Sequence, residues 1–236
     1  MAITGVLFDF SGTLFRVEPA ECWLRAVLAE AGIAVPEGEL LHWADRLERA
    51  GALPGGAEPA AVPDRLRRLW EHRDESAGLH RSAYTTLSRE TGLPWDLHEA
   101  LYARSSTPEA WSPYPDAAEV LSLLKQRGLR VGVLSNIGWD LRPLFRAHGF
   151  APFVDSYVLS FEHGIQKPDP TLFRIACDKL NTAPGDTLMV GDSRRADGGA
   201  QAIGCAFLQV PHLPVTERPD ALRSVLGLLD GASPER

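Results

Sequence analysis

The chain has 236 residues, of which 44% are hydrophobic and 23% are charged, so it can bury a sizeable core and is neither disordered nor fibrous in composition. Its 31 acidic and 24 basic residues give a formal net charge of −7, which repels nucleic acid at long range. No apolar run approaches the roughly 20 residues of a membrane helix, and the N-terminus lacks a signal-peptide layout. We therefore expect a globular, cytoplasmic monomer or homodimer that binds neither nucleic acid nor membrane.

The first apolar run spans residues 3–8, and the pattern then changes. Residues 16–111 show no convincing strand pattern and instead have the spacing of amphipathic helices joined by loops rich in Gly and Pro. The expected helices are at 18–31, 37–50, 64–71, 80–91 and 95–104. We interpret this segment as a helical unit inserted after the first strand.

Strands and helices alternate from residue 112 onward. Further strands are expected at 129–134, 154–159, 187–190 and 205–210, with helical periodicity at 116–128 and 171–180. This alternation is typical of a parallel sheet covered by helices on both faces. Residues 1–15 and 112–236 are therefore predicted to form an α/β core, a Rossmann-like doubly wound parallel sheet.

Polar side chains follow the apolar runs at four places. Because the carboxyl ends of parallel strands meet at one edge of a sheet, we expect these side chains to converge and to bind a ligand there. The four sets are Asp9-Phe10-Ser11-Gly12-Thr13, Ser135-Asn136, Lys167-Pro168, and Gly191-Asp192-Ser193 with Asp197.

The chemistry of these side chains suits the transfer of a phosphoryl group. A carboxylate such as Asp9 that attacks phosphorus forms an acyl phosphate and divides one difficult displacement into two easier steps. Main-chain N–H groups around Phe10 and Gly12 can form an anion-binding nest. Ser135 and Asn136 offer a hydroxyl and an amide that can donate to phosphoryl oxygens.

A divalent metal ion is also suggested by the residue types. Magnesium prefers about six oxygen ligands and typically takes one or two carboxylates from the protein. Asp9 and Asp192, each at the end of a predicted strand, can supply two of them.

Taken together, the four motifs resemble those of the haloacid dehalogenase-like hydrolases, a superfamily of aspartate-nucleophile phosphatases, phosphonatases and dehalogenases. The resemblance covers residues 1–15 and 112–212, and the helical insert at 16–111 is similar to the family's first-position cap. It implies that Lys167 balances the charge of Asp9 and the phosphoryl group.

The same resemblance implies a full set of ligands. The metal would be Mg²⁺, held by Asp9, the main-chain carbonyl of Ser11, and Asp192, with Asp197 nearby. The phosphoryl group would be bound by Phe10, Gly12, Thr13, Ser135, Asn136 and Lys167.

Ser11 departs from the family pattern, which has at this position a second Asp that acts as general acid and base. A serine hydroxyl has far too high a pKa for this task, whereas a positioned carboxyl contributes about 10²–10⁴-fold. Three explanations stay open. The leaving group needs little protonation, as with an acyl or aryl phosphate or an anhydride; a residue of the insert donates the proton; or the protein binds a phosphorylated ligand and turns it over only vestigially. The candidate donors are His42, Asp45, His72 and His80.

The resemblance favours a magnesium-dependent phosphatase that acts on a small phosphorylated metabolite through an aspartyl-phosphate intermediate on Asp9, with Ser11 and Lys167 at the catalytic centre. Dehalogenases of the family work without metal and typically lack the equivalent of Asp192. Phosphonoacetaldehyde hydrolases need a cap lysine, and residues 16–111 contain none. The alternatives are a dehalogenase-like hydrolase with a non-phosphate leaving group and a catalytically weak regulatory protein. Several arginines of the insert suit an anionic substrate, among them Arg25, Arg46, Arg65 and Arg81.

Overall fold

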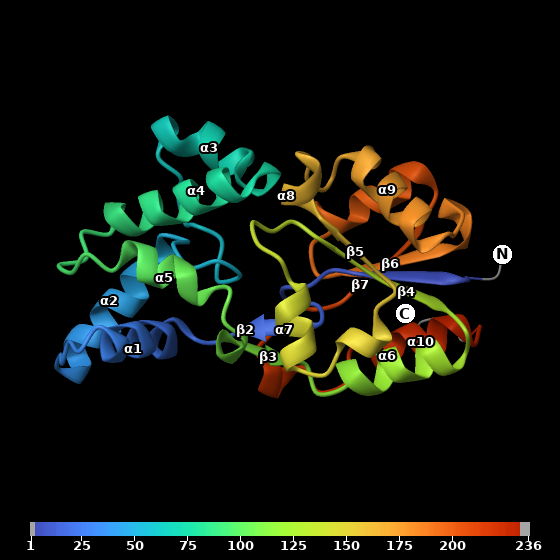
Figure 1. Cartoon of the computed structure of the whole chain (residues 1–236), viewed down its shortest axis with the longest axis horizontal. Coiled ribbons are helices and arrows are strands. Elements are labelled where there is room, and N and C mark those ends of the chain that lie inside the picture. The colour runs from blue at the N-terminus through green and yellow to red at the C-terminus, as the bar shows by residue number, and fades with distance from the viewer. Residues whose placement is uncertain (1–2, 232–236) are drawn as a thin grey trace.

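A central parallel sheet organises the molecule (Figure 1). The computed structural model describes residues 3–231, so the ends of the predicted core, 1–2 and 232–236, lie outside the described residues. The sheet has five strands in the order β5-β4-β1-β6-β7, and every neighbouring pair is parallel. Each strand lies where an apolar run was expected, to within two residues. Their bounds are β1 (Gly5–Phe8), β4 (Arg130–Ser135), β5 (Ser156–Leu159), β6 (Thr187–Gly191) and β7 (Ala206–Gln209).

Helices cover both faces of this sheet (Figure 1). α6 (Ala117–Gln126) and α10 (Arg223–Leu229) pack on one face, and α9 (Pro170–Leu180) and the 3-10 segment η6 (Asp197–Ile203) pack on the other. The predicted Rossmann-like α/β fold is therefore confirmed.

The central strand shows why the sheet is buried on both sides. Successive side chains of a strand point to opposite faces. Val6 and Phe8 belong to a core cluster that includes Val120 of α6, whereas Leu7 belongs to a second cluster with Phe173 of α9. An uninterrupted apolar run is thus what this position requires.

The helical insert, which we define as residues 18–110, leaves the core through two short strands that the sequence pattern did not reveal. β2 (Phe15–Val17) and β3 (Trp111–Pro113) form a separate antiparallel pair. Three residues are too few to show a period of two, and the predicted boundaries fall inside these strands. The α-helices of the insert are α1 (Ala20–Glu30), α2 (Glu37–Arg49), α3 (Arg67–Glu71), α4 (Ala77–Glu90) and α5 (His98–Arg104).

The remaining elements are short. The α-helices α7 (Arg142–Ala147) and α8 (Ser160–His163) lie in the core, and the sequence pattern did not single them out or α10. The other 3-10 segments are η1 (Asp64–Leu66), η2 (Arg73–Glu75), η3 (Pro108–Ala110), η4 (Ala151–Phe153), η5 (Pro184–Asp186) and η7 (Val215–Glu217). Within residues 3–231, no helix has the length and apolarity needed to cross a membrane.

Candidate active site

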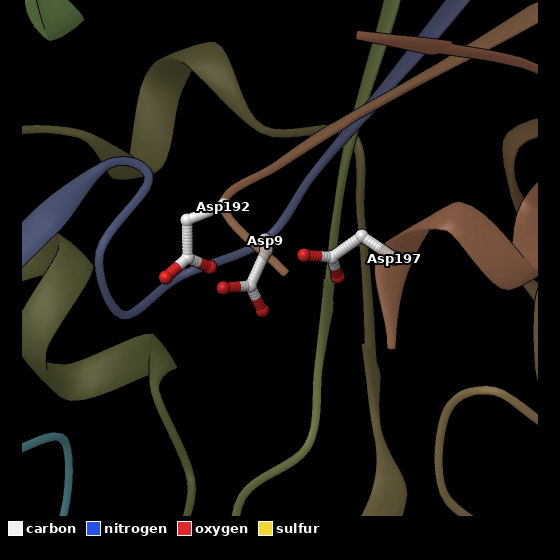
Figure 2. Close-up of side chains that lie close together, drawn as sticks. All are labelled: Asp9, Asp192 and Asp197. Atoms are coloured by element: carbon white, nitrogen blue, oxygen red, sulfur yellow. The ribbon is translucent and has the colours of Figure 1, made fainter. Parts of the chain in front are cut away.

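Three aspartates meet at the carboxyl edge of the sheet (Figure 2). Asp9 directly follows β1, Asp192 directly follows β6, and Asp197 begins η6. One carboxylate oxygen from each lies within 4.8 Å of the other two. The parallel topology therefore brings together side chains from the beginning and the end of the chain.

Lys167 is the cation at the centre of this group. Its Nζ donates hydrogen bonds to Asp9 Oδ1 at 2.7 Å, Asp197 Oδ1 at 2.6 Å and the Leu134 carbonyl at 3.0 Å. The side chain is only 2% exposed. Burial lowers the pKa of Lys167, but the Asp197 and Asp9 carboxylates outweigh burial and hold that pKa above its ordinary value. The ammonium is therefore a fixed positive charge.

The carboxylates outnumber this cation, and their titration reflects it. Burial raises the pKa of Asp9 to about 7, against the attraction of Lys167 and with the repulsion of Asp197 and Asp192. Burial likewise raises the pKa of Asp197. A second positive charge placed here would relieve the imbalance.

The oxygen atoms present fit a divalent metal ion. Carboxylates are the hard ligands that Mg²⁺ prefers. The main-chain carbonyl of Ser11 accepts no hydrogen bond from the residues between 3 and 231, so this oxygen has an unused ligand position. Asp197 has less freedom, because Oδ1 accepts from Lys167 and Oδ2 accepts from Ser193 N–H at 3.0 Å.

The main chain of Lys167 is held from two sides. Asn136 Oδ1 accepts from Lys167 N–H at 2.7 Å, and Asn136 Nδ2 donates to the Lys167 carbonyl at 2.9 Å. Downstream, α9 begins at once, and its capping residue Asp169 accepts from Thr171 N–H at 2.8 Å. The observed role of Asn136 is thus to position Lys167, and a direct contact to a phosphoryl group stays a prediction.

The predicted phosphoryl-binding residues differ in where their side chains lie. Phe10, Ser135, Asn136 and Lys167 line the cavity above Asp9, whereas Gly12 does not. The Ser135 hydroxyl makes no hydrogen bond within the described part of the chain and so can donate to a ligand. Thr13 does not line this cavity either. Its side chain is fully buried, and its hydroxyl has no partner among the described residues.

Gly12 is required by its surroundings. It has a φ of 80°, in the left-handed region, and a Cβ at this position would collide with His212 and Asp192. His212 Nδ1 is hydrogen-bonded to Asp192 Oδ2. The glycine therefore lets the loop after β1 pass close to the loop after β7.

Arg218 holds the loop after β1 by hydrogen bonds to its main chain, and no motif in the sequence pointed to this arginine. Its Nη1 donates to the Gly12 carbonyl at 2.6 Å and to the Pro211 carbonyl at 3.2 Å, and its Nη2 donates to the Thr13 carbonyl. The guanidinium carbon lies 3.1 Å from the centre of the Tyr114 ring. The side chain is 2% exposed. Arg218 is separated from Gly12 by 206 positions, so only the folded chain reveals the contact.

A cavity of about 460 Å³ opens above Asp9, between the core and the helical insert. The insert contributes residues from its loop after α2, from η2 and from α4. The four arginines singled out in the sequence do not line it, whereas Arg73 does. Arg25, Arg65 and Arg81 are instead exposed and paired with glutamates.

Most of the candidate proton donors of the insert lie away from the cavity. His42, Asp45 and His72 are exposed and do not line the cavity, whereas His80 does. His80 is 3% exposed, and its Nδ1 is hydrogen-bonded to the Tyr102 hydroxyl at 2.9 Å. Burial lowers the pKa of His80 to about 3, so the imidazole is neutral at physiological pH. It cannot serve there as a charged acid.

Ser11 faces the insert. Its hydroxyl lies 3.5 Å from the Gly55 carbonyl, which also accepts a hydrogen bond from Arg16 Nη1 at 3.2 Å. The residue that departs from the family pattern is thus turned toward the loop that follows α2.

A sequence profile of the haloacid dehalogenase-like hydrolases matches residues 3–204. The chain belongs to this hydrolase family. The resemblance drawn from its four motifs is therefore confirmed, and the sheet edge described above is where the family motifs come together.

The relatives within this family include both phosphatases and dehalogenases. (S)-2-haloacid dehalogenase 1 of a Pseudomonas species is 36% identical over 150 residues, which are 63% of this chain and 63% of the dehalogenase. The match thus spans less than two thirds of that protein. Phosphoserine phosphatase of Thermus thermophilus is 36% identical over 233 residues, 92% of each chain. The crystal structure of a dehalogenase superposes with a TM-score of 0.61 at 26% identity, over 96% of each chain.

Proposed function

We propose that this haloacid dehalogenase-like hydrolase is a magnesium-dependent phosphatase that acts on a small phosphorylated metabolite, with the helical insert as its cap. The observation that carries the proposal is the excess of carboxylates at the sheet edge. Asp9, Asp192 and Asp197 converge around the single ammonium group of Lys167. Dehalogenases of the family, by the resemblance above, typically lack the equivalent of Asp192 and use no metal.

In this proposal each core residue has a defined task. An Asp9 carboxylate oxygen attacks phosphorus and the bond to the leaving oxygen breaks, which gives an acyl phosphate that water then hydrolyses. Lys167 and the Ser135 hydroxyl stabilise the charge of the transferring group. Mg²⁺, held by Asp9, the Ser11 carbonyl and Asp192, would supply further positive charge. Asp197 keeps Lys167 in place.

Ser11 then decides which phosphate esters react quickly. Of the four candidate proton donors in the insert, His80 lines the cavity, and its imidazole is neutral at physiological pH. None of the four is therefore a charged acid at this cavity. We therefore take the leaving group to depart with little protonation. Aryl and acyl phosphates are favoured over alkyl phosphates, by about the 10²–10⁴-fold that a general acid supplies.

The test is phosphate release from aryl, acyl and alkyl phosphates, measured with Mg²⁺ and with EDTA. Wild type should act only with metal, Asp9→Asn should be inactive, and Ser11→Asp should accelerate the alkyl phosphate selectively. Wild type that is inert on all three classes, with no rescue by Ser11→Asp, would contradict the proposal.

A dehalogenase-like reaction is the second candidate, because a (S)-2-haloacid dehalogenase is 36% identical over 63% of this chain. The same carboxylate, Asp9, would then attack carbon and release halide. Halide release from 2-haloacids that persists in EDTA would favour this hypothesis. A third hypothesis, a binding protein without turnover, predicts saturable ligand binding that Asp9→Asn leaves intact.

A further inference from the structure

The cavity is lined, around η2 of the insert and the loop that follows β4 of the core, by polar groups with unused hydrogen-bonding capacity. Arg73 Nε and Trp139 Nε1 are buried donors that have no acceptor among residues 3–231. Both side chains line the same cavity as Asp9. Buried donors without partners are costly, and they are rare unless a ligand, ion or water completes them.

Asp74 is the complementary acceptor beside them. Its side chain is 6% exposed, and no described residue donates a hydrogen bond to its carboxylate. His80 Nε2 at 3.6 Å and Arg73 Nε at 3.7 Å lie beyond hydrogen-bond distance. Burial raises the pKa of Asp74, so a cation brought to this carboxylate would restore its ordinary ionisation.

The position of this pair is fixed relative to the core. Gln166, the residue before Lys167, accepts from Asp74 N–H at 3.1 Å and donates to the Glu71 carbonyl at 2.6 Å. Arg73 is held on the insert side, where Nη1 donates to the Trp70 carbonyl at 2.8 Å and the guanidinium lies 3.8 Å from the centre of the Trp70 ring. The unsatisfied groups are therefore pre-positioned over the site at the sheet edge.

The charges in this wall select among possible ligands. The Arg73 guanidinium faces the Asp74 carboxylate, and a second carboxylate, that of Glu58, lies 3.7 Å from Arg73 Nη2 at the rim. A ligand group with a carboxylate satisfies the free donors of Arg73 and Trp139. An ammonium on the same ligand satisfies Asp74 and offsets the excess negative charge, which a hydroxyl would not do.

We propose that the Arg73–Asp74–Trp139 wall binds the zwitterionic end of a phosphorylated amino acid, with the carboxylate on Arg73 and Trp139 and the ammonium on Asp74. This inference rests on the proposed phosphatase function, because the phosphoryl group is taken to sit on Asp9 and Lys167. The volume of about 460 Å³ suits a ligand of this size.

The test uses binding to Asp9→Asn with Mg²⁺, measured by titration calorimetry, so that the leaving group has no influence. Three alkyl phosphates isolate the two charges: O-phospho-L-serine carries both, 3-phosphoglycerate has a hydroxyl in place of the ammonium, and phosphoethanolamine lacks the carboxylate. O-phospho-L-serine should bind about 10- to 100-fold more tightly than either analogue, as expected for one charge-assisted hydrogen bond.

Variants assign each charge to its residue. When Arg73→Met is combined with Asp9→Asn, O-phospho-L-serine should no longer bind more tightly than phosphoethanolamine. When Asp74→Asn is combined with Asp9→Asn, it should no longer bind more tightly than 3-phosphoglycerate. The matched exposed substitutions Arg81→Met and Asp45→Asn should leave both ratios unchanged. Trp139→Phe, which removes the indole donor and keeps an aromatic ring, serves where Arg73→Met does not fold and should weaken carboxylate binding alone.

Equal binding of the three ligands, or ratios that survive these substitutions, would overturn the inference. Release of phosphate from p-nitrophenyl phosphate by wild type is measured in parallel. If wild type hydrolyses p-nitrophenyl phosphate but O-phospho-L-serine is not bound preferentially, only the proposed role of the Arg73–Asp74–Trp139 wall is rejected. If wild type acts on no phosphate ester, the phosphatase proposal itself is rejected.

Discussion

The two walls of the cavity are built differently. On the core side, Lys167 makes three hydrogen bonds of 2.6 to 3.0 Å, and both oxygens of Asp197 have donors. On the opposite side, Arg73 Nε has no acceptor and Asp74 has no donor within the described residues. The Lys167 ammonium and the Asp197 carboxylate are therefore satisfied by protein groups, whereas the Ser135 hydroxyl and the excess negative charge stay open to a ligand. In our proposal, the unsatisfied groups of Arg73 and Asp74 face the variable part of the substrate, which completes their hydrogen bonds.

This comparison predicts that the core site fails most severely when one partner is removed. Lys167→Met leaves the buried carboxylates of Asp9 and Asp197 without their cation, so the free energy of unfolding in EDTA should fall by about 3–5 kcal/mol. Arg73→Met removes a group with fewer bonds and should cost less. Urea denaturation measures both.

The exposed Lys179→Met is the matched control and should change stability by no more than about 0.5 kcal/mol. A Lys167→Met protein as stable as this control would mean that the core carboxylates do not depend on Lys167. The contrast between the two walls would then be lost.

Arg218 tests how far the core site depends on the hydrogen bonds that hold the loop after β1. Arg218→Met removes the donors to the carbonyls of Gly12, Thr13 and Pro211, so stability should fall by about 2–3 kcal/mol. Phosphate release should fall with it, because Asp9 is carried on that loop. The exposed Arg223→Met, which loses only the ion pair to Glu119, is the control. Equal effects of the two substitutions would show that the loop after β1 does not depend on Arg218.

The sequence revealed the core far better than the insert, for a physical reason. A buried parallel strand is a continuous apolar run, and the residues directly after it lie at one edge of the sheet, so Asp9, Ser135 and Asp192 could be placed from local pattern alone. Lys167 and Asp197 were found through the spacing of family motifs.

No comparable rule applies to the insert. Which face of an amphipathic helix or loop meets the cavity depends on how the helices dock, and Arg73 and Asp74 have no pattern that separates them from exposed residues such as Arg81. The role of Arg218 depends on a contact across 206 positions, and β2 and β3 are too short to show periodicity. These features follow from tertiary packing.

His80 provides a test on the insert side through pH. Its pKa is about 3 in the folded protein and 6.5 when unfolded, so the unfolded chain binds the extra proton between these values. Stability is therefore lost as pH falls through 6.5, by about 2 kcal/mol between pH 7 and pH 5. The stability difference between wild type and His80→Gln should shrink by this amount over that range. The exposed His42→Gln should show no such change, and a pH-independent His80→Gln difference would contradict the burial of a neutral imidazole.

Asp9 tests the core side through pH, with the smallest expected change in stability. The change has the opposite sign to that of His80, because stability falls as pH rises. Its pKa rises from 3.8 to about 7 on folding, so the folded state holds the proton more tightly and wild-type stability falls as pH increases through this range. Asn has no proton to lose. In EDTA, the free energy of unfolding of Asp9→Asn should therefore rise by about 1 kcal/mol relative to that of wild type between pH 4 and pH 5. A difference that stays flat or reverses in urea denaturation at these two pH values would show that Lys167 alone compensates the carboxylates. The need for a second cation at the sheet edge, on which the proposed metal site depends, would then lose its electrostatic basis.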